Sequence, residues 1–340
     1  MPELPDITLY VEHLARRLTG ARLTDARVRG PNLLRTADPP LDAALGRAVT
    51  GVRRLGKRIV FELDGGLFLV LHLMIAGRLH WADAGPAARP AKGARPATPA
   101  ARAGRAPLAQ FEFTTGTLSL TEAGTKKRAG LWLVRGEAGL AALDPGGIEP
   151  LTATPAEFAA RLALESHTLK RALTDPRLFS GIGNAYSDEI LHRAGLSPLR
   201  LTRQLTDAEA RRLNAAVRDT LTEWTARLRE ETGEGFPEGV TAFRPEMAVH
   251  GRFRKPCPTC GTAIQRIAYA ANEVNYCPRC QTEGRLLADR GLSRLLREDW
   301  PKTIEELEEG RAGVARAGAA PRQVRQAPRQ VSRSPRSGSS

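Results

Sequence analysis

The N-terminus of the chain carries residues that could perform nucleophilic chemistry. It reads Met1-Pro2-Glu3-Leu4-Pro5-Asp6, and removal of Met1 would leave Pro2 as a free secondary amine. An α-amine with a pKa near 7.8 is roughly 14% neutral at pH 7, compared with roughly 0.04% for a lysine, so it is the readier nucleophile. A helix that starts here would disfavour the protonated amine and favour an ionised Glu3. By themselves, these residues would also make an ordinary helix start.

The four cysteines have the spacing of a metal site. Cys257 and Cys260 form one Cys-x-x-Cys pair, and Cys277 and Cys280 form a second pair after sixteen intervening residues. In a reducing compartment, this pattern is typical of one structural Zn²⁺ ion held by four thiolates. Four unliganded thiols are the alternative. A zinc site with four protein ligands has no open position for water, so the catalytic chemistry must lie elsewhere.

A zinc ion at this site would fix the hairpin Ile264–Tyr276 between the two cysteine pairs. A rigid two-stranded ribbon can enter a DNA groove. The same ribbon could instead serve protein contacts or only stability.

The elements that position these groups change in character along the chain. Ile7, Val11, Leu14 and Leu18 recur at helical spacing, and Gly20 would end that helix. Strand-like runs follow at Ile59–Leu63, Leu67–His72, Phe111–Thr114, Leu118–Thr121 and Leu131–Val134. These runs predict a β-sandwich or barrel.

The middle of the chain has helical periodicity. Thr154 with Glu157, and Thr206 with Glu209, have the spacing of a capping box at a helix start. Another helix is predicted from Gly183-Asn184 to about Ala194, with Gly195 as its cap. The glycines of Gly181-Ile182-Gly183 would let backbone amides approach a phosphate at this helix N-terminus, and Asn184 could add a neutral donor.

The net charge of +14 suggests a polyanionic partner, but its position weakens that inference. Five basic residues lie in 84–107 and seven arginines in 311–340, and neither segment contains an acid, so the rest of the chain is near +2. Both segments have too little apolar content to fold, and they could be either basic arms near nucleic acid or simply solvated low-complexity sequence. No membrane span or signal peptide is evident, so we expect a cytoplasmic, nucleoid-associated protein.

We therefore predict a multidomain α+β fold. An N-terminal β-sandwich with one helix would span 1–135 and contain a disordered insert at 84–107. An all-helical domain would span 136–245. A zinc ribbon and a helix from Leu286 to Leu296 would lie within 246–309, before a disordered basic tail at 310–340.

Four motifs together resemble one family of repair enzymes. Met1–Asp6, Leu55-Gly56-Lys57-Arg58, the segment from Gly181 to Glu189 and the two cysteine pairs occur in that order. They resemble the formamidopyrimidine-DNA glycosylase and endonuclease VIII family over about residues 2–290. The resemblance implies a monomeric enzyme that flips a damaged base out of double-stranded DNA, displaces it and cleaves the abasic strand, with one structural Zn²⁺ and no redox cofactor.

The resemblance also implies a role for each matching residue. Pro2 would attack the sugar C1′ to form a Schiff base, and Glu3 would be the general acid and base. Asp6 stands where the family usually has a glutamate and could assist. Lys57 would contact the lesion or its phosphate. Asn184, with Lys170 upstream, would belong to the phosphate clamp of a helix–two-turn–helix domain.

Several positions depart from the family pattern. Asn272 stands where the zinc hairpin has a phosphate-binding arginine, and an amide lacks the charge-assisted bond of a guanidinium. Ile75 stands where the family inserts a methionine into the vacated stack, although Met74 is adjacent. In the second such loop Lys127 and Arg128 keep the cations, while Ala129 replaces a phenylalanine.

Two other functions compete with this interpretation. A catalytically silent DNA-binding paralogue would explain the missing hairpin arginine and phenylalanine, whereas the retained Pro2, Glu3 and Lys57 favour an enzyme. A ribosome- or RNA-associated protein with a similar helical module and zinc ribbon would leave the N-terminal motif unexplained.

Overall fold

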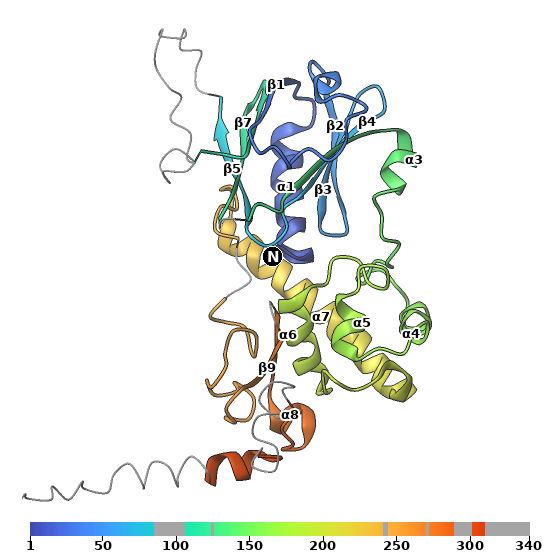
Figure 1. The fold of residues 1–340 in the computed structure, drawn as a ribbon, viewed down its shortest axis with the longest axis vertical. Coiled ribbons are helices and arrows are strands. Elements are labelled where there is room, and N and C mark those ends of the chain that lie inside the picture. Colours follow the sequence, from blue (N-terminus) through green and yellow to red (C-terminus); the bar gives the residue numbers. More distant parts are fainter. Residues whose placement is uncertain (85–105, 124–125, 241–243, 270–271, 289–300, 310–340) are drawn as a thin grey trace, which may run out of the picture.

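The computed structural model describes residues 1–84, 106–123, 126–240, 244–269, 272–288 and 301–309. The N-terminal sheets lie at one end of the long axis, and the helical and cysteine-bearing parts lie at the other (Figure 1). The chain begins at the junction between these two regions. The predicted multidomain α+β architecture is confirmed.

Two four-stranded antiparallel sheets build the N-terminal part. Their strands are ordered β1-β6-β7-β5 in one sheet and β2-β3-β4-β8 in the other. The strands are β1 (Leu23–Val28), β2 (Val49–Leu55), β3 (Arg58–Leu63), β4 (Leu67–His72), β5 (Gly77–Asp83), β6 (Ala109–Phe113), β7 (Gly116–Glu122) and β8 (Gly130–Arg135). All five predicted strand runs are confirmed with small shifts at their ends, and β1, β2 and β5 are additional to the prediction.

Helix α1 (Leu4–Leu18) packs into the core of this sandwich. Its apolar stripe of Ile7, Tyr10, Leu14 and Leu18 is completely buried. Phe61 and Phe111, one from each sheet, belong to the same core cluster. Burial of this stripe fixes the helix, so the reactive N-terminus is held by the main hydrophobic core of the domain.

The middle of the chain is helical. It contains α3 (Gly136–Ala141), α4 (Pro155–Ala163), α5 (Leu169–Thr174), α6 (Asn184–Ala194) and α7 (Asp207–Thr232), with a short 3-10 turn at Thr202–Gln204. Another 3-10 turn, Leu41–Ala44, lies between β1 and β2 in the N-terminal part. The Thr154–Glu157 and Thr206–Glu209 capping boxes are both confirmed. Helix α6 ends at Gly195 in the left-handed conformation, as predicted.

The C-terminal part is a small cysteine-bearing unit. Strands β9 (Gln265–Tyr269) and β10 (Asn272–Tyr276) form the predicted antiparallel hairpin, and α8 (Pro278–Thr282) follows it. The predicted helix Leu286–Leu296 is wrong at its start, because 286–288 are not helical, and its remainder lies outside the described residues. A helical segment occurs instead at 304–309.

Most of the predicted insert at 84–107 and the whole tail at 310–340 lie outside the described residues. None of the helices within the described ranges is long and apolar enough to cross a membrane.

Candidate active site and zinc centre

The start of α1 is anchored in the helical domain as well as in the sandwich. The Leu4 side chain belongs to the core cluster of the helical domain, and its backbone N–H donates to the Gly181 carbonyl at 2.9 Å. Gly181 has a positive φ of 80°, and a Cβ there would lie 2.9 Å from Leu4 Cβ. A glycine is therefore needed at 181 for both its backbone conformation and the close approach of α1.

The Glu3 carboxylate sits on the N-terminus of α6. Its two oxygens accept hydrogen bonds from the backbone N–H groups of Gly183 (2.7 Å), Ala185 (2.8 Å) and Tyr186 (3.2 Å). Glu3 is only 2% exposed. Charge-assisted bonds from a helix N-terminus stabilise an ionised carboxylate. The sequence predicted that the dipole of the helix starting at Glu3 would stabilise this carboxylate. In the structure it is held instead by α6, about 180 residues away in the chain.

This arrangement corrects the predicted phosphate clamp. The amides at the start of α6 were expected to face a DNA phosphate, but three of them donate to Glu3. The Asn184 side chain, at the first helical position, is partly exposed and makes no hydrogen bond with the described residues. Asn184 itself thus stays available as a donor.

Gly183 marks the close approach of three groups. A Cβ at Gly183 would lie 2.5 Å from Glu3 Cδ and 2.7 Å from Lys57 Nζ. Its φ of −134° is ordinary, so space and not backbone conformation requires the glycine. The sequence-predicted Glu3 and Lys57 therefore meet against the same backbone. Burial lowers the pKa of Lys57, and the Glu3 carboxylate opposes that shift.

A pocket of about 330 Å³ opens beside these residues and includes Met1. Pro2, the next residue, is buried. In the chain that retains Met1, burial lowers the pKa of the terminal amine, Glu3 opposes the shift, and Arg78 adds to it. The Met1 amine is thus shifted toward its neutral form, which is the nucleophilic form of an amine.

Asp6 supports the first turn of α1. Its Oδ2 accepts the Glu3 backbone N–H at 2.9 Å, and its Oδ1 lies 3.2 Å from an Arg244 guanidinium nitrogen. Burial raises the pKa of Asp6 to about 6, and the bonds from Glu3 and Arg244 oppose the shift. In this position Asp6 holds the Pro2–Glu3 segment in place, and Arg244 ties it to the chain beyond α7.

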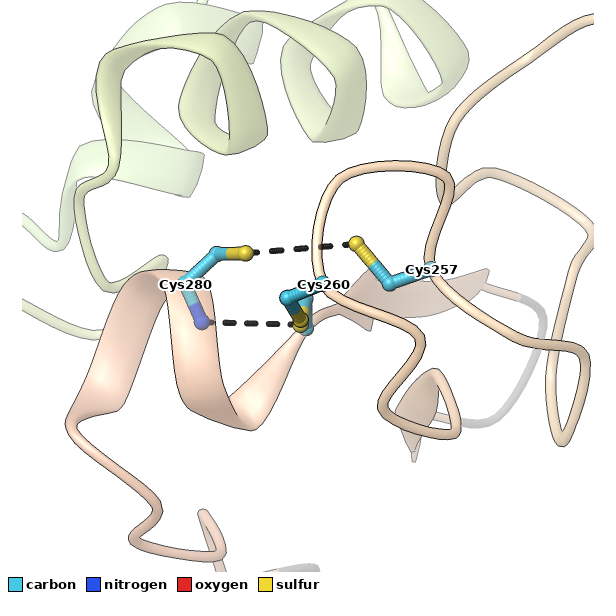
Figure 2. A group of neighbouring side chains, drawn as sticks. Cys257, Cys260 and Cys280 are labelled. Atoms are coloured by element: carbon cyan, nitrogen blue, oxygen red, sulfur yellow. Dashed lines mark hydrogen bonds between the residues drawn. The ribbon is translucent and has the colours of Figure 1, made fainter.

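The four cysteines converge as predicted. Their sulfur atoms all lie within 4.8 Å of one another, with Cys257 Sγ 3.9 Å from Cys280 Sγ and Cys260 Sγ 3.4 Å from Cys277 Sγ. Figure 2 shows Cys257, Cys260 and Cys280 turned toward a common centre. Four thiolates at this spacing fit one tetrahedral structural zinc ion.

Two acids of α6 connect this zinc module to the helical domain, and neither was assigned a role from the sequence. Asp188 Oδ2 accepts from Asn275 N at 3.1 Å and lies 2.8 Å from His250 Nδ1. Glu189 accepts the backbone N–H groups of 248–250 at 2.7 to 2.9 Å. The available signal was two consecutive acids between the apolar pairs Ala185-Tyr186 and Ile190-Leu191, because carboxylates on a buried helix face need partners.

Comparison with known proteins assigns the chain to a family. The model of the formamidopyrimidine-DNA glycosylase N-terminal domain matches residues 1–125, its H2TH domain matches 147–232, and the zinc finger found in FPG and IleRS matches 254–282. The formamidopyrimidine-DNA glycosylase of Thermus thermophilus is 33% identical over 291 residues, covering 84% of this chain and 100% of that protein. The chain belongs to the formamidopyrimidine-DNA glycosylase family.

Further members and structures agree with this. The formamidopyrimidine-DNA glycosylase of Salinispora arenicola is 33% identical over 305 residues, covering 84% of this chain and 98% of that protein. The crystal structure of the Thermus thermophilus glycosylase has a TM-score of 0.65 at 31% identity, covering 82% of this chain and 98% of that one. The Lactococcus lactis glycosylase has the same fold, with a TM-score of 0.68 at 23% identity over 82% of this chain and 99% of that one.

The residues predicted to contact DNA occupy different environments in this member of the glycosylase family. Lys170 is 7% exposed, and its ammonium lies 2.5 Å from Asp188 Oδ1 and 2.6 Å from the Asn184 carbonyl oxygen. A phosphate contact by Lys170 would require this buried ion pair to open. Asn272 begins β10, and its side chain lies outside what the structure describes.

Two loops were expected to fill the space left by a flipped base, and the first of them, around Met74 and Ile75, has an apolar tip. Met74 lines the pocket and has a positive φ of 52°. Its backbone N–H donates to His72 Nδ1 at 3.1 Å, which fixes the turn. Ile75 is 53% exposed and is one of few large apolar side chains in the described residues that face solvent.

The second loop is organised by a buried carboxylate. Glu122 accepts the backbone N–H groups of Arg128 at 2.9 Å and Ala129 at 3.2 Å. The side chains of Lys127 and Arg128 are exposed. Ala129 is 3% exposed and therefore offers little surface for stacking.

Zinc removal tests the structural role of the cysteine site in this glycosylase. We expect one tightly bound zinc per chain, because the four thiolates close the coordination shell. Replacing Cys277 with serine, or stripping the metal with a chelator, should unfold the hairpin and abolish DNA binding. Metal analysis and a DNA-binding titration check this, and metal-free protein that still binds DNA normally would contradict it.

Proposed function

We propose that the chain is a bifunctional base-excision repair enzyme, a DNA glycosylase that also cleaves abasic sites. The observation that supports this most strongly is the meeting of Glu3, Lys57 and the chain start beside one pocket. Family membership supports the glycosylase activity. The lyase activity is inferred from the amine chemistry available at Pro2.

The geometry supports the following steps. After removal of Met1, the Pro2 nitrogen attacks C1′ of the damaged nucleotide, and the bond between C1′ and the base breaks. Glu3 takes the proton that the Pro2 nitrogen loses after the attack and passes it to the sugar ring oxygen as the ring opens, which leaves an iminium between Pro2 and C1′. Loss of a C2′ proton then expels the 3′ phosphate, and a second elimination expels the 5′ phosphate.

Each neighbouring group has a defined task in this scheme. The α6 amides orient the Glu3 carboxylate, and Asp6 holds the backbone that carries Pro2. Lys57 would bind a phosphate oxygen or the lesion, because its ammonium reaches the same pocket. A catalytically silent DNA-binding protein would not need Pro2, Glu3 and Lys57 close together. Their proximity therefore favours the enzyme.

Double-stranded DNA is the proposed partner. The Lactococcus lactis glycosylase, which has this fold, was solved in complex with DNA that contains an abasic site. In our proposal the zinc hairpin and α6 lie along the DNA backbone, and the loop tip at Ile75 fills the space that the flipped nucleotide leaves.

We expect the enzyme to cleave abasic DNA better than it excises 8-oxoguanine from an intact duplex. Flipping a base costs a few kcal/mol of unstacking, and least where pairing is already lost. The buried Ala129 offers little surface to offset that cost, and an amide at 272 carries no positive charge. A loss of about 2 kcal/mol would slow turnover of a stacked lesion roughly thirtyfold.

Single-turnover assays test this prediction. The substrates are 8-oxoguanine opposite cytosine, a ring-opened purine, an oxidised pyrimidine and an abasic site. Equal rates on 8-oxoguanine and on the abasic strand would show that other residues compensate. No cleavage of any substrate, with binding retained, would identify a silent DNA-binding protein.

A further inference from the structure

The pocket beside the N-terminus contains a cation that the scheme above does not use. Arg58 follows Lys57 at the start of β3 and lines the same pocket. Its guanidinium carbon lies 5.8 Å from the centroid of the Trp132 ring on β8. Within the described part of the chain the guanidinium has no ion-pair or hydrogen-bond partner, and Nε is buried without one.

The sheet holds Arg58 in this place. Strand register sets Arg58 opposite His72 on β4, and His72 opposite Gly130 on β8. A Cβ on Gly130 would lie 2.4 Å from Trp132 Cη2, so the indole occupies the space above this glycine. The Arg58 guanidinium in turn packs over the Trp132 indole. Arg58 is therefore a positioned cation and not a freely rotating surface group.

The pocket carries an excess of positive charge. Lys57 and Arg58 both line it, and Asp144 is the one acid among the lining residues. The Asp144 carboxylate accepts the Gly146 N–H at 2.9 Å and is not ion-paired with Arg58. Burial, together with the nearby Arg58 and Lys57, lowers the pKa of His72 to about 4, so His72 is neutral at pH 7. Glu3 faces Lys57, so Arg58 is the lining cation whose charge a bound anion would balance.

We propose that Arg58 binds a backbone phosphate of the DNA substrate within the active-site pocket, beside the nucleotide that Pro2 attacks. This inference rests on the proposed function. A guanidinium can give two parallel hydrogen bonds to a phosphate, which an ammonium does not. Arg58 would thereby supply a charge-assisted phosphate contact of the kind that the amide at Asn272 lacks.

The salt dependence of DNA binding tests Arg58 directly. The substitution Arg58→Met keeps an unbranched apolar stem above Trp132 and removes the charge. With a duplex that carries an uncleavable tetrahydrofuran abasic analogue, each lost phosphate contact lowers the slope of log K against log salt by about one. We expect that change for R58M, with binding weakened about tenfold. R58K should keep the slope and show intermediate affinity.

Arg53 provides a matched control. It lies on the neighbouring strand β2, with its guanidinium 5.9 Å from the Phe68 ring centroid, but it is already paired with Glu62 at 2.5 Å. R53M should therefore bind like the wild type. A wild-type salt slope in R58M, or an equal change in R53M, overturns the proposal.

A separate measurement tests the proposed lyase activity. Borohydride trapping of the wild-type protein on abasic DNA reports the lyase chemistry. R53M should form the trapped complex as the wild type does, because Arg53 does not line the pocket. Absence of trapping in the wild type, with an altered salt slope in R58M, would remove the lyase proposal and leave the phosphate contact in place.

Discussion

Borohydride should trap a covalent complex between this protein and abasic DNA, and the link should be to Pro2. The Schiff base is the species that borohydride reduces, and Pro2 becomes a free amine when Met1 is removed. Pro2→Gly should reduce trapping strongly. An extra residue retained before Pro2 should abolish it, a loss of more than about a hundredfold, because the nitrogen is then an amide.

Mass spectrometry supplies the necessary controls for this result. The purified wild-type protein must lack Met1, and the tryptic fragment cross-linked to DNA must begin at Pro2. Both variants should bind abasic DNA with nearly wild-type affinity, because neither change removes a charged or hydrogen-bonding side chain. Undiminished trapping in both variants would assign the nucleophile to a lysine and reject Pro2.

The second large effect is expected from Gly183→Ala. The added methyl group would lie 2.5 Å from Glu3 Cδ and 2.7 Å from Lys57 Nζ. Lys57 is flexible, but Glu3 is held by three amides and could move only by giving up those hydrogen bonds. General acid and base catalysis contributes about a hundredfold to ten-thousandfold, so the single-turnover rate on abasic DNA should fall by at least about a hundredfold.

Gly239→Ala is the control for this substitution. Gly239 has no neighbouring atom within 4 Å of an added Cβ and no positive φ, so alanine should be neutral there. A thermal unfolding curve separates loss of the site from loss of the fold. If G183A retains the wild-type rate, Glu3 is not the proton donor, or its position does not matter.

The parts of the fold that the sequence predicted are the ones that local chemistry decides. The Thr154–Glu157 and Thr206–Glu209 capping boxes satisfy helix N–H groups within four residues, so their meaning does not depend on the rest of the protein. The cysteine spacing is equally local. The strand Leu67–His72 was predicted with its bounds correct because both of its faces are buried in core clusters, which makes the run apolar nearly throughout.

The missed features depend on partners that are distant in the chain. Strand β2 contains Gly51 and two arginines, and its periodicity is weak because one face lies near solvent. The partner of Glu3 is 180 residues away, so its own helix was the only dipole that the local sequence offered. Lys170 looked like one more DNA-facing cation, since its buried partner Asp188 lies on another helix.

Helix α6 limits which sequence changes the protein can accept. Its first turn binds Glu3, and Asp188 and Glu189, one turn later, bind the zinc module. Each residue of an α-helix advances the side-chain direction by about 100°. Suppose that one residue is inserted or deleted between Gly183 and Asp188 while the contact with Glu3 is kept. Asp188 and Glu189 would then point away from the zinc module. The two contacts together therefore fix the length of this stretch.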